Sequence, residues 1–241
     1  MTFAYSPAWP HGRLEEIFPD VFFVNGTNRT HFGGVDLQFS RGMLVVRERE
    51  ALTLINTVRL DEDGLLALAA LGRVAHVIRL GAFHGRDDPF YRDRFGAALW
   101  SLPGTPHADG RDADQALGQH APLPLRDAEV FVFQSAKHPE AALLLRREGG
   151  ILVTCDAVQS WARVDRFFSA ETAAQYVRDG RIRPANIPST WREACEPDVS
   201  DFHRLLALDF RHLISAHGEP LRDDAHARLT ARVTELFGAK R

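Results

Sequence analysis

The sequence has few of the features that mark secreted, membrane or nucleic-acid-binding proteins. Its two cysteines, Cys155 and Cys195, are too few for a disulfide framework and lack the Cys-x-x-Cys spacing of a zinc site. No apolar run approaches the roughly 20 residues of a membrane-spanning helix, and the N-terminal residues show no secretory signal pattern. The formal net charge of -3 argues against a general electrostatic attraction to nucleic acid. We therefore expect a soluble, cytoplasmic protein whose partner is a small molecule, with no nucleic acid and no membrane.

The composition is that of an ordinary globular domain. Hydrophobic residues make up 45% and charged residues 25% of the chain, and its 241 residues suffice for one large domain, or two small ones, with a hydrophobic core. The chain contains no internal repeat, and no Gly-rich phosphate loop follows an apolar run, so nucleotide- and dinucleotide-binding folds lose support. We treat residues 1–241 as one domain, and nothing in the sequence indicates an oligomeric state.

Strand patterns dominate the chain, and helical patterns are inserted between them. Turn signals at Asn25-Gly26 and Arg41-Gly42 separate the first strands, and residues 103–124 have the composition of a long surface loop. The predicted strands are residues 21–24, 37–39, 43–46, 52–58, 74–80, 98–102, 129–134, 141–145, 151–154 and 212–216. The predicted helices are residues 64–71, 89–95, 170–178, 201–207 and 223–237, with an extended segment at 184–191. This order predicts an α/β fold with two packed mixed sheets rather than a doubly wound parallel sheet.

Histidine or aspartate follows an apolar run at four places, where we expect a strand to end. The first of these segments, residues 77–89, carries His84, Asp87 and Asp88 within five residues. Imidazole and carboxylate groups are common ligands of zinc, manganese and iron. The alternative for this segment is that Asp87 or Asp88 caps a helix that begins at Pro89, a position where proline is favoured.

The other three segments carry His138, Asp156 and His217. His138 lies in a loop between two apolar strands, and a lone histidine in such a loop is usually solvated. Asp156 ends an apolar strand, and burying its carboxylate requires a metal, another cation or backbone N–H groups. By strand alternation, the neighbouring Cys155 points to the opposite face and belongs to the core rather than to a site. His217 again ends a strand, and Gly218 after it permits an unusual backbone turn.

Taken in order, these segments resemble the metallo-β-lactamase-fold superfamily over nearly the whole chain. AKHPEAALLL resembles the family's Gly-His-Thr-Pro-Gly-Ser segment, ILVTCDAV its Gly-Asp strand, and LISAHGEPL its final Gly-His-Gly segment. The resemblance implies a four-layer αβ/βα sandwich of two mixed sheets flanked by helices, with the metal site at one edge of the sheets. It also implies that His138, Asp156 and His217 are metal ligands, with Asp156 bridging two ions.

The first motif departs from the family pattern His-x-His-x-Asp-His. His84 and Asp88 match this pattern, whereas Arg86 and Pro89 replace two of its histidines. Arginine cannot ligate a metal at accessible pH, and its charge opposes a nearby cation. If Asp87 compensates for a missing ligand, the remaining candidates suffice for one divalent ion, so we expect one ion rather than two. The candidate ligands are His84, Asp87, Asp88, His138, Asp156 and His217, and the candidate ions are zinc, manganese and iron.

Two functions are compatible with these residues. The first is a metal-dependent hydrolase of a small ester, thioester, lactone or phosphoester that uses a metal-activated water. In this reading Asp88 orients the water or accepts its proton, and Arg86 holds an anionic group of the substrate. The second is a non-catalytic relative that binds a small anion without a metal, with Arg86 supplying the positive charge. We favour the hydrolase, because convergent carboxylates and imidazoles are costly to bury without a cation.

Overall fold

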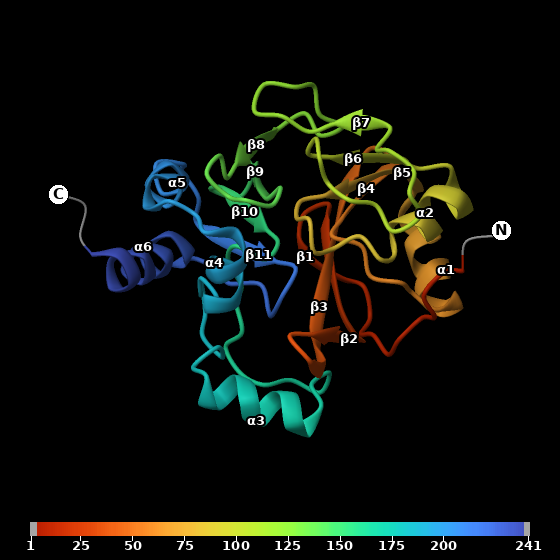
Figure 1. Ribbon diagram of the computed structural model, residues 1–241. Coiled ribbons are helices and arrows are strands. Elements are labelled where there is room, and N and C mark those ends of the chain that lie inside the picture. The colour runs from red at the N-terminus through yellow and green to blue at the C-terminus, as the bar shows by residue number, and fades with distance from the viewer. Residues whose placement is uncertain (1–3, 239–241) are drawn as a thin grey trace.

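Two β-sheets pack face to face, and helices cover the outer side of each sheet (Figure 1). This computed structural model describes residues 4–238. The larger sheet runs in chain order from β1 to β7, antiparallel from β1 to β4 and parallel from β4 to β7. Its strands are β1 (Glu15–Phe18), β2 (Val21–Phe32), β3 (Val35–Glu48), β4 (Ala51–Ile55), β5 (Arg73–Arg79), β6 (Ala98–Ser101) and β7 (Gln115–Ala116).

The smaller sheet has the strand order β11-β10-β9-β8 and is also mixed, because β10 pairs parallel with β11 and antiparallel with β9. Its strands are β8 (Ala128–Val132), β9 (Ala141–Leu145), β10 (Ile151–Thr154) and β11 (His212–Ser215). The helices are α1 (Glu62–Leu71), α2 (Asp88–Phe95), α3 (Ala170–Arg178), α4 (Ser189–Cys195), α5 (Val199–Leu205) and α6 (Ala225–Phe237). The predicted α/β sandwich of two mixed sheets flanked by helices is confirmed.

The turns predicted at Asn25-Gly26 and Arg41-Gly42 are wrong. β2 and β3 form one long hairpin in which Asn25 pairs with Gly42 and Gly26 pairs with Arg41, while the turn lies at Gly33-Gly34. Close packing explains why glycine occupies the strand positions. A Cβ on Gly42 would lie 2.5 Å from the Phe23 ring, and one on Gly26 would lie 2.9 Å from Val58. The correction matters because it moves Arg41 from a turn to the middle of a strand.

The segment predicted to be extended at residues 184–191 contains the first turn of α4. Pro188 is the N-cap residue of this helix, where its missing N–H costs no hydrogen bond. Elsewhere the helices follow the sequence patterns closely. At the start of α1, the Asp61 side chain accepts a hydrogen bond of 2.9 Å from the Gly64 N–H, as expected for an N-cap aspartate.

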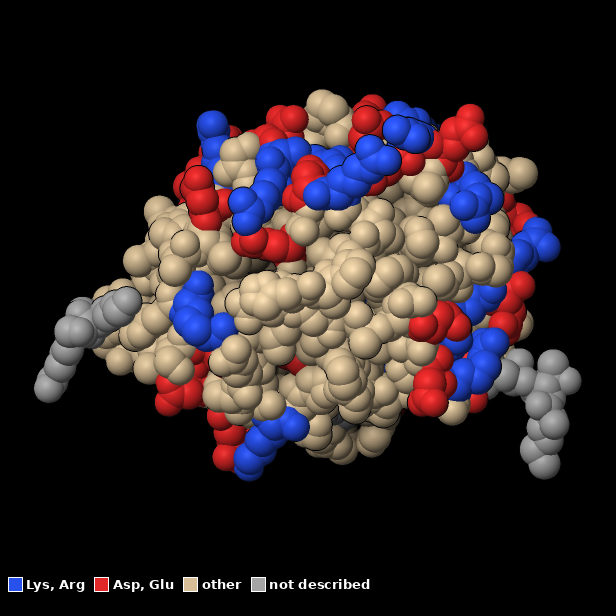
Figure 2. Space-filling model, turned by 90° about the horizontal axis from the view of Figure 1, so that it is seen from above, with Lys and Arg blue, Asp and Glu red and all other residues tan. Residues whose placement is uncertain are grey.

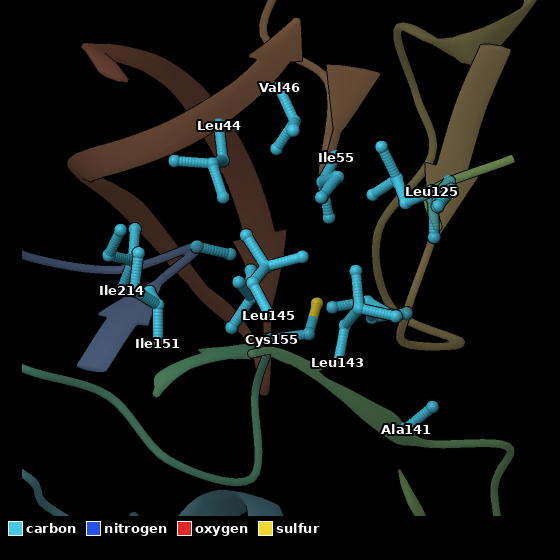
Figure 3. Packing of buried hydrophobic residues seen from close by; sticks show 14 of the residues in the cluster. Leu44, Val46, Ile55, Leu125, Ala141, Leu143, Leu145, Ile151, Cys155 and Ile214 are labelled. Atoms are coloured by element: carbon cyan, nitrogen blue, oxygen red, sulfur yellow. The ribbon is translucent and has the colours of Figure 1, made fainter. Parts of the chain in front are cut away.

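The main core lies between the inner faces of the two sheets. Leu44 and Ile55 from the larger sheet meet Leu143 and Ile151 from the smaller one, and Figure 3 shows the Cys155 sulfur directed into the same cluster. The prediction that Cys155 packs in the core is therefore confirmed. Further clusters lie between each sheet and its outer helices, which completes the four layers.

The charges on the described surface are distributed as the small formal net charge of -3 leads one to expect. In Figure 2, basic and acidic side chains are intermixed, and this face carries no broad region of one sign. Within residues 4–238, no helix combines the length and apolar character that spanning a bilayer requires.

We predict that Leu143→Ala, in the middle of the inter-sheet core, lowers the free energy of unfolding by about 2–5 kcal/mol, because it leaves a cavity between two rigid sheets. Leu143 is fully buried, whereas Leu66 on α1 is 69% exposed. Leu66→Ala is therefore the matched control and should change stability by at most about 0.5 kcal/mol. Urea unfolding measures both variants, and equal effects would contradict the assignment of the core.

Candidate metal centre

Three side chains from the two sheets converge at one edge of the sandwich. His84 follows β5 of the larger sheet, while Asp156 and His217 follow the adjacent parallel strands β10 and β11 of the smaller sheet. His217 Nε2 lies 3.0 Å from both Asp156 Oδ1 and His84 Nε2, and His84 Nε2 lies 3.4 Å from Asp156 Oδ1. Of the six predicted ligands, these three form the cluster with metal-ligand spacing in the described part of the chain.

The backbone around His217 is held by close contacts. The N–H of Ser160 donates to the His217 carbonyl at 2.9 Å, and a Cβ on Gly218 would lie 1.8 Å from the Ser160 carbonyl oxygen. Gly218 has φ +96 and leaves room only for a hydrogen at this point. The rings of Phe39 and Trp161 pack against the imidazole of His217, with centroid separations of 5.3 and 5.5 Å. This packing fixes the ring of His217 at the edge of the cluster.

Burial and local charge determine the protonation of the cluster. Burial lowers the pKa of His84 to about 4, so this imidazole is neutral at neutral pH. Burial alone would raise the pKa of Asp156, but the imidazoles of His84 and His217, which lie within 3.4 Å of its Oδ1, hold it well below its ordinary value. At neutral pH the cluster therefore presents an ionised carboxylate beside a neutral imidazole.

The tautomer of His217 follows from its second nitrogen. His217 Nδ1 lies 3.2 Å from the carbonyl oxygen of Ser40, which accepts hydrogen bonds only, so Nδ1 carries the proton. In the neutral ring, the lone pair of Nε2 then points toward Asp156. Ligating histidines commonly have such a backbone carbonyl behind them. A lone pair facing a carboxylate oxygen at 3.0 Å is unfavourable unless a cation or a proton lies between them.

The second ring nitrogen of His84 faces a guanidinium group, that of Arg41, instead of a backbone carbonyl. Arg41 Nη2 lies 3.4 Å from His84 Nδ1, and Arg41 Nη1 lies 3.4 Å from Asp87 Oδ2. Because a guanidinium group only donates, Nδ1 of His84 accepts and the proton of the neutral ring lies on Nε2. Sequence reasoning missed Arg41 because the Gly after it indicated a turn. The continuous strand pattern of residues 35–48 was the signal that would have placed it.

Asp87 and Asp88 lie beneath the cluster rather than in it. Asp87 is the N-cap of α2 but makes no capping hydrogen bond with its side chain; its Oδ2 accepts from the Arg59 N–H at 3.1 Å. Asp88 Oδ1 accepts from Thr57 Oγ1 at 2.6 Å, and burial raises the pKa of this carboxyl. Among the described residues 4–238, the buried Asp88 Oδ2 finds no hydrogen-bond partner. Neither carboxyl group lines the pocket above the cluster.

His138 and Arg86 both lie outside the cluster of His84, Asp156 and His217. His138 is exposed, and its ring packs on Phe83 with a centroid separation of 5.1 Å. It lies outside the candidate ligand cluster. Arg86 does line the pocket, where its Nη1 donates to the carbonyl of Arg29 at 2.8 Å.

A buried carboxyl group that the sequence analysis overlooked, that of Glu140, lies close to Asp156. Glu140 is 1% exposed, and its Oε1 accepts from the Ala157 N–H at 2.8 Å. Glu140 also lies near Asp156 and Cys155 with ligand-type spacing, but the Cys155 sulfur belongs to the apolar core. The Lys-His-Pro sequence before Glu140 is typical of a surface loop, so its burial had no signal in the sequence.

Comparison with known proteins places this geometry in context. No protein-family model matches the sequence, and no curated protein matches it significantly. Solved structures do match over nearly the full chain. The DIM-1 metallo-β-lactamase has 13% identity and a TM-score of 0.61, covering 94% of this chain and 99% of its own. FIM-1 from Pseudomonas aeruginosa, in its mono-zinc form, has 12% identity and a TM-score of 0.59, covering 95% and 97%.

A metallo-β-lactamase from Erythrobacter litoralis has 14% identity and a TM-score of 0.57, covering 95% of this chain and 96% of its own. This chain has the metallo-β-lactamase fold. Because the identities are low, the likeness shows the fold alone, and the activity must be inferred from the residues of the site. Within the metallo-β-lactamase fold of this chain, the cluster of His84, Asp156 and His217 lies where strands of both sheets end.

The shifted pKa of His84 predicts a pH dependence of stability in the metal-free protein. The folded-state pKa is about 4, below the ordinary value of 6.5. As the pH falls through this window, the unfolded chain takes up a proton that the folded chain does not, so stability is lost between pH 6.5 and pH 4. The part of this loss that comes from His84, measured as the difference between the wild type and His84→Gln, should reach about 2–3 kcal/mol at pH 4.5, whereas the raised pKa values of Asp88 and Glu140 act in the opposite direction.

Urea unfolding in the presence of EDTA, at pH 7 and pH 4.5, measures this loss. His84→Gln should remove most of it, whereas His120→Gln, at an exposed histidine, should leave it in place. Equal pH dependence in the wild type and His84→Gln would show that the buried imidazole is not its source.

Proposed function

We propose that this protein is a metal-dependent hydrolase that holds one divalent ion with His84, Asp156 and His217. The supporting observation is the convergence of three donor atoms at separations of 3.0–3.4 Å. Donors that bind zinc at about 2.0–2.2 Å are separated from one another by roughly 2.9–3.5 Å. Two histidines and a carboxylate also form known catalytic sites for zinc and iron(II), with positions left open for water and substrate.

The residues fit one ion with one rearrangement. Asp156 is ionised, and the Ser40 carbonyl holds a proton of His217 on Nδ1, which leaves Nε2 as the nitrogen that can ligate an ion. His84 must transfer its proton from Nε2 to Nδ1, next to Arg41, before it can ligate. Since Asp87 is paired with Arg41 and His138 is exposed, the donors for a second ion are lacking among the predicted ligands. This favours one ion over two.

A bound divalent ion would polarise a carbonyl or phosphoryl group and acidify the attacking water. The proposed substrates are small esters, thioesters, lactones or phosphoesters. Arg86 lines the pocket beside the cluster and is suited to hold an anionic part of the substrate. A proton-accepting role for Asp88 stays a prediction. Its carboxyl group is buried, accepts a hydrogen bond from Thr57 and does not line the pocket.

We predict about one equivalent of zinc, manganese or iron per chain in purified or metal-supplemented protein. Asp156→Ala and His217→Ala should each weaken metal binding at least 10-fold, in line with the loss of a direct ligand. His138→Ala should leave the stoichiometry unchanged, because this histidine is exposed and packs on Phe83. Elemental analysis after dialysis measures all four proteins. Metal loss in His138→Ala but not in His217→Ala would contradict the proposed ligand set.

Hydrolysis is tested with the metal-loaded protein and a panel of p-nitrophenyl acetate, p-nitrophenyl phosphate, a thioester and a lactone. We expect turnover of at least one class, lost on chelation and reduced at least about 10²-fold in His217→Ala, because a catalytic metal contributes several kcal/mol to transition-state stabilisation. Turnover that persists equally in the chelated protein would exclude the metal-dependent mechanism.

One observation favours a second candidate function, a metal-free anion-binding protein. The buried guanidinium of Arg41 lies 3.4 Å from the ring of His84, and its positive charge opposes a dication in the cluster. A protein that binds no metal after supplementation, and in which Asp156→Ala changes nothing in metal content, would fit this function and not the hydrolase.

A further inference from the structure

A pocket of about 170 Å³ lies directly above the candidate metal centre. Its lining combines three arginines with a single carboxylate, that of Asp156, and with several aromatic rings. The arginines are Arg41, Arg86 and Arg181. With three arginines against one aspartate, the charged groups of the lining are predominantly positive.

The three arginines differ in how their charge is compensated. Arg41 pairs with Asp87 at 3.4 Å, and Arg181 pairs with Asp179 at 3.4 Å. Within residues 4–238, Arg86 has no carboxylate within ion-pair distance, and its Nη1 donates to a backbone carbonyl instead. An anion bound beside Arg86 would give this guanidinium the charged partner that it lacks.

Aromatic side chains form the apolar part of the lining. Phe39 of β3 stacks on Tyr176 of α3, with a centroid separation of 5.5 Å and an interplanar angle of 29°. Trp191 of α4 also lines the pocket, and α3 lies beside the hairpin of β2 and β3 (Figure 1). Cavities of about 150 Å³ accept a benzene ring. The pocket therefore has space for one ring and a small polar group.

We propose that this pocket binds a small molecule that carries one oxyanion on an aromatic or similarly flat apolar body, an aryl carboxylate or aryl phosphate, with Arg86 paired to the oxyanion. A neutral aromatic ligand would leave the positive charge of Arg86 without a counter-charge. An anion that has no apolar part would leave the aromatic lining in contact with water. Binding of this molecule requires no metal and is therefore independent of the proposed function. Only its role as substrate or product of the hydrolase rests on the proposed function.

Isothermal titration of the EDTA-dialysed protein tests the proposal separately from the hydrolase. The probes are phenylacetate and phenyl phosphate, compared with their anionic halves, acetate and inorganic phosphate, and with neutral benzyl alcohol. At least one aryl anion should bind at least 10-fold more tightly than either half, and the two aryl anions distinguish a carboxylate from a phosphate site. Equal or tighter binding of benzyl alcohol, or no binding of either aryl anion, would overturn the proposal.

Arg86→Gln should weaken binding of the aryl anion at least 10-fold and leave benzyl alcohol unaffected, while Arg86→Lys should recover part of the loss. Arg228→Gln, at a half-exposed arginine of α6, is the matched control and should bind like the wild type. Unchanged aryl-anion affinity in a folded Arg86→Gln protein would overturn the assignment.

A second variant keeps the test decisive if Arg86→Gln does not fold. Ala194 lies on the partly exposed side of α4 and lines the pocket. Ala194→Phe should fill the apolar part and reduce aryl-anion binding at least 10-fold. Binding of the aryl anion at wild-type affinity in Ala194→Phe would place the ligand elsewhere and refute the proposal.

Discussion

The hydrogen bond from the Gly42 N–H to the Ala216 carbonyl, 2.7 Å long, joins the two sheets at the edge where the site forms. Gly42 lies in β3 of the larger sheet, and Ala216 directly follows β11 of the smaller one. A Cβ on Gly42 would lie 3.1 Å from the Ser215 carbonyl oxygen, so the strands approach this closely because the residue is glycine. The same contact brings the Ser40 carbonyl to His217 and the guanidinium of Arg41 to His84.

The electrostatic balance of the site depends on this approach. Asp156 is ionised and lies half-buried between two imidazoles, and Arg41 with Asp87 forms a buried ion pair beside His84. Each charge has its partner in an element far away in the sequence. Removing one partner would leave the other charge buried and unpaired, which costs far more than the pair itself contributes. The site is therefore a small network in which the tautomer of each histidine is set by the group behind it.

Much of the fold was predictable because its physical causes are local. Alternating and continuous apolar runs identify most strands, and an acidic first turn with an N-cap aspartate identifies α1. The first hairpin was mispredicted because a glycine required for close packing has the same local signature as a glycine required for a turn. The distinction depends on Phe23 and Val58, which contact these glycines only in the folded chain.

The sequence by itself determined that each candidate ligand follows an apolar strand, and hence that each lies near a sheet edge. It also determined the core position of Cys155 through strand alternation. Only the tertiary structure decided which of the six candidate ligands converge. Asp87 turns to Arg41 and the Arg59 N–H, Asp88 turns to Thr57, and His138 turns to solvent. The reason is that a strand end fixes where a residue lies, whereas the direction of its side chain depends on partners contributed by distant segments.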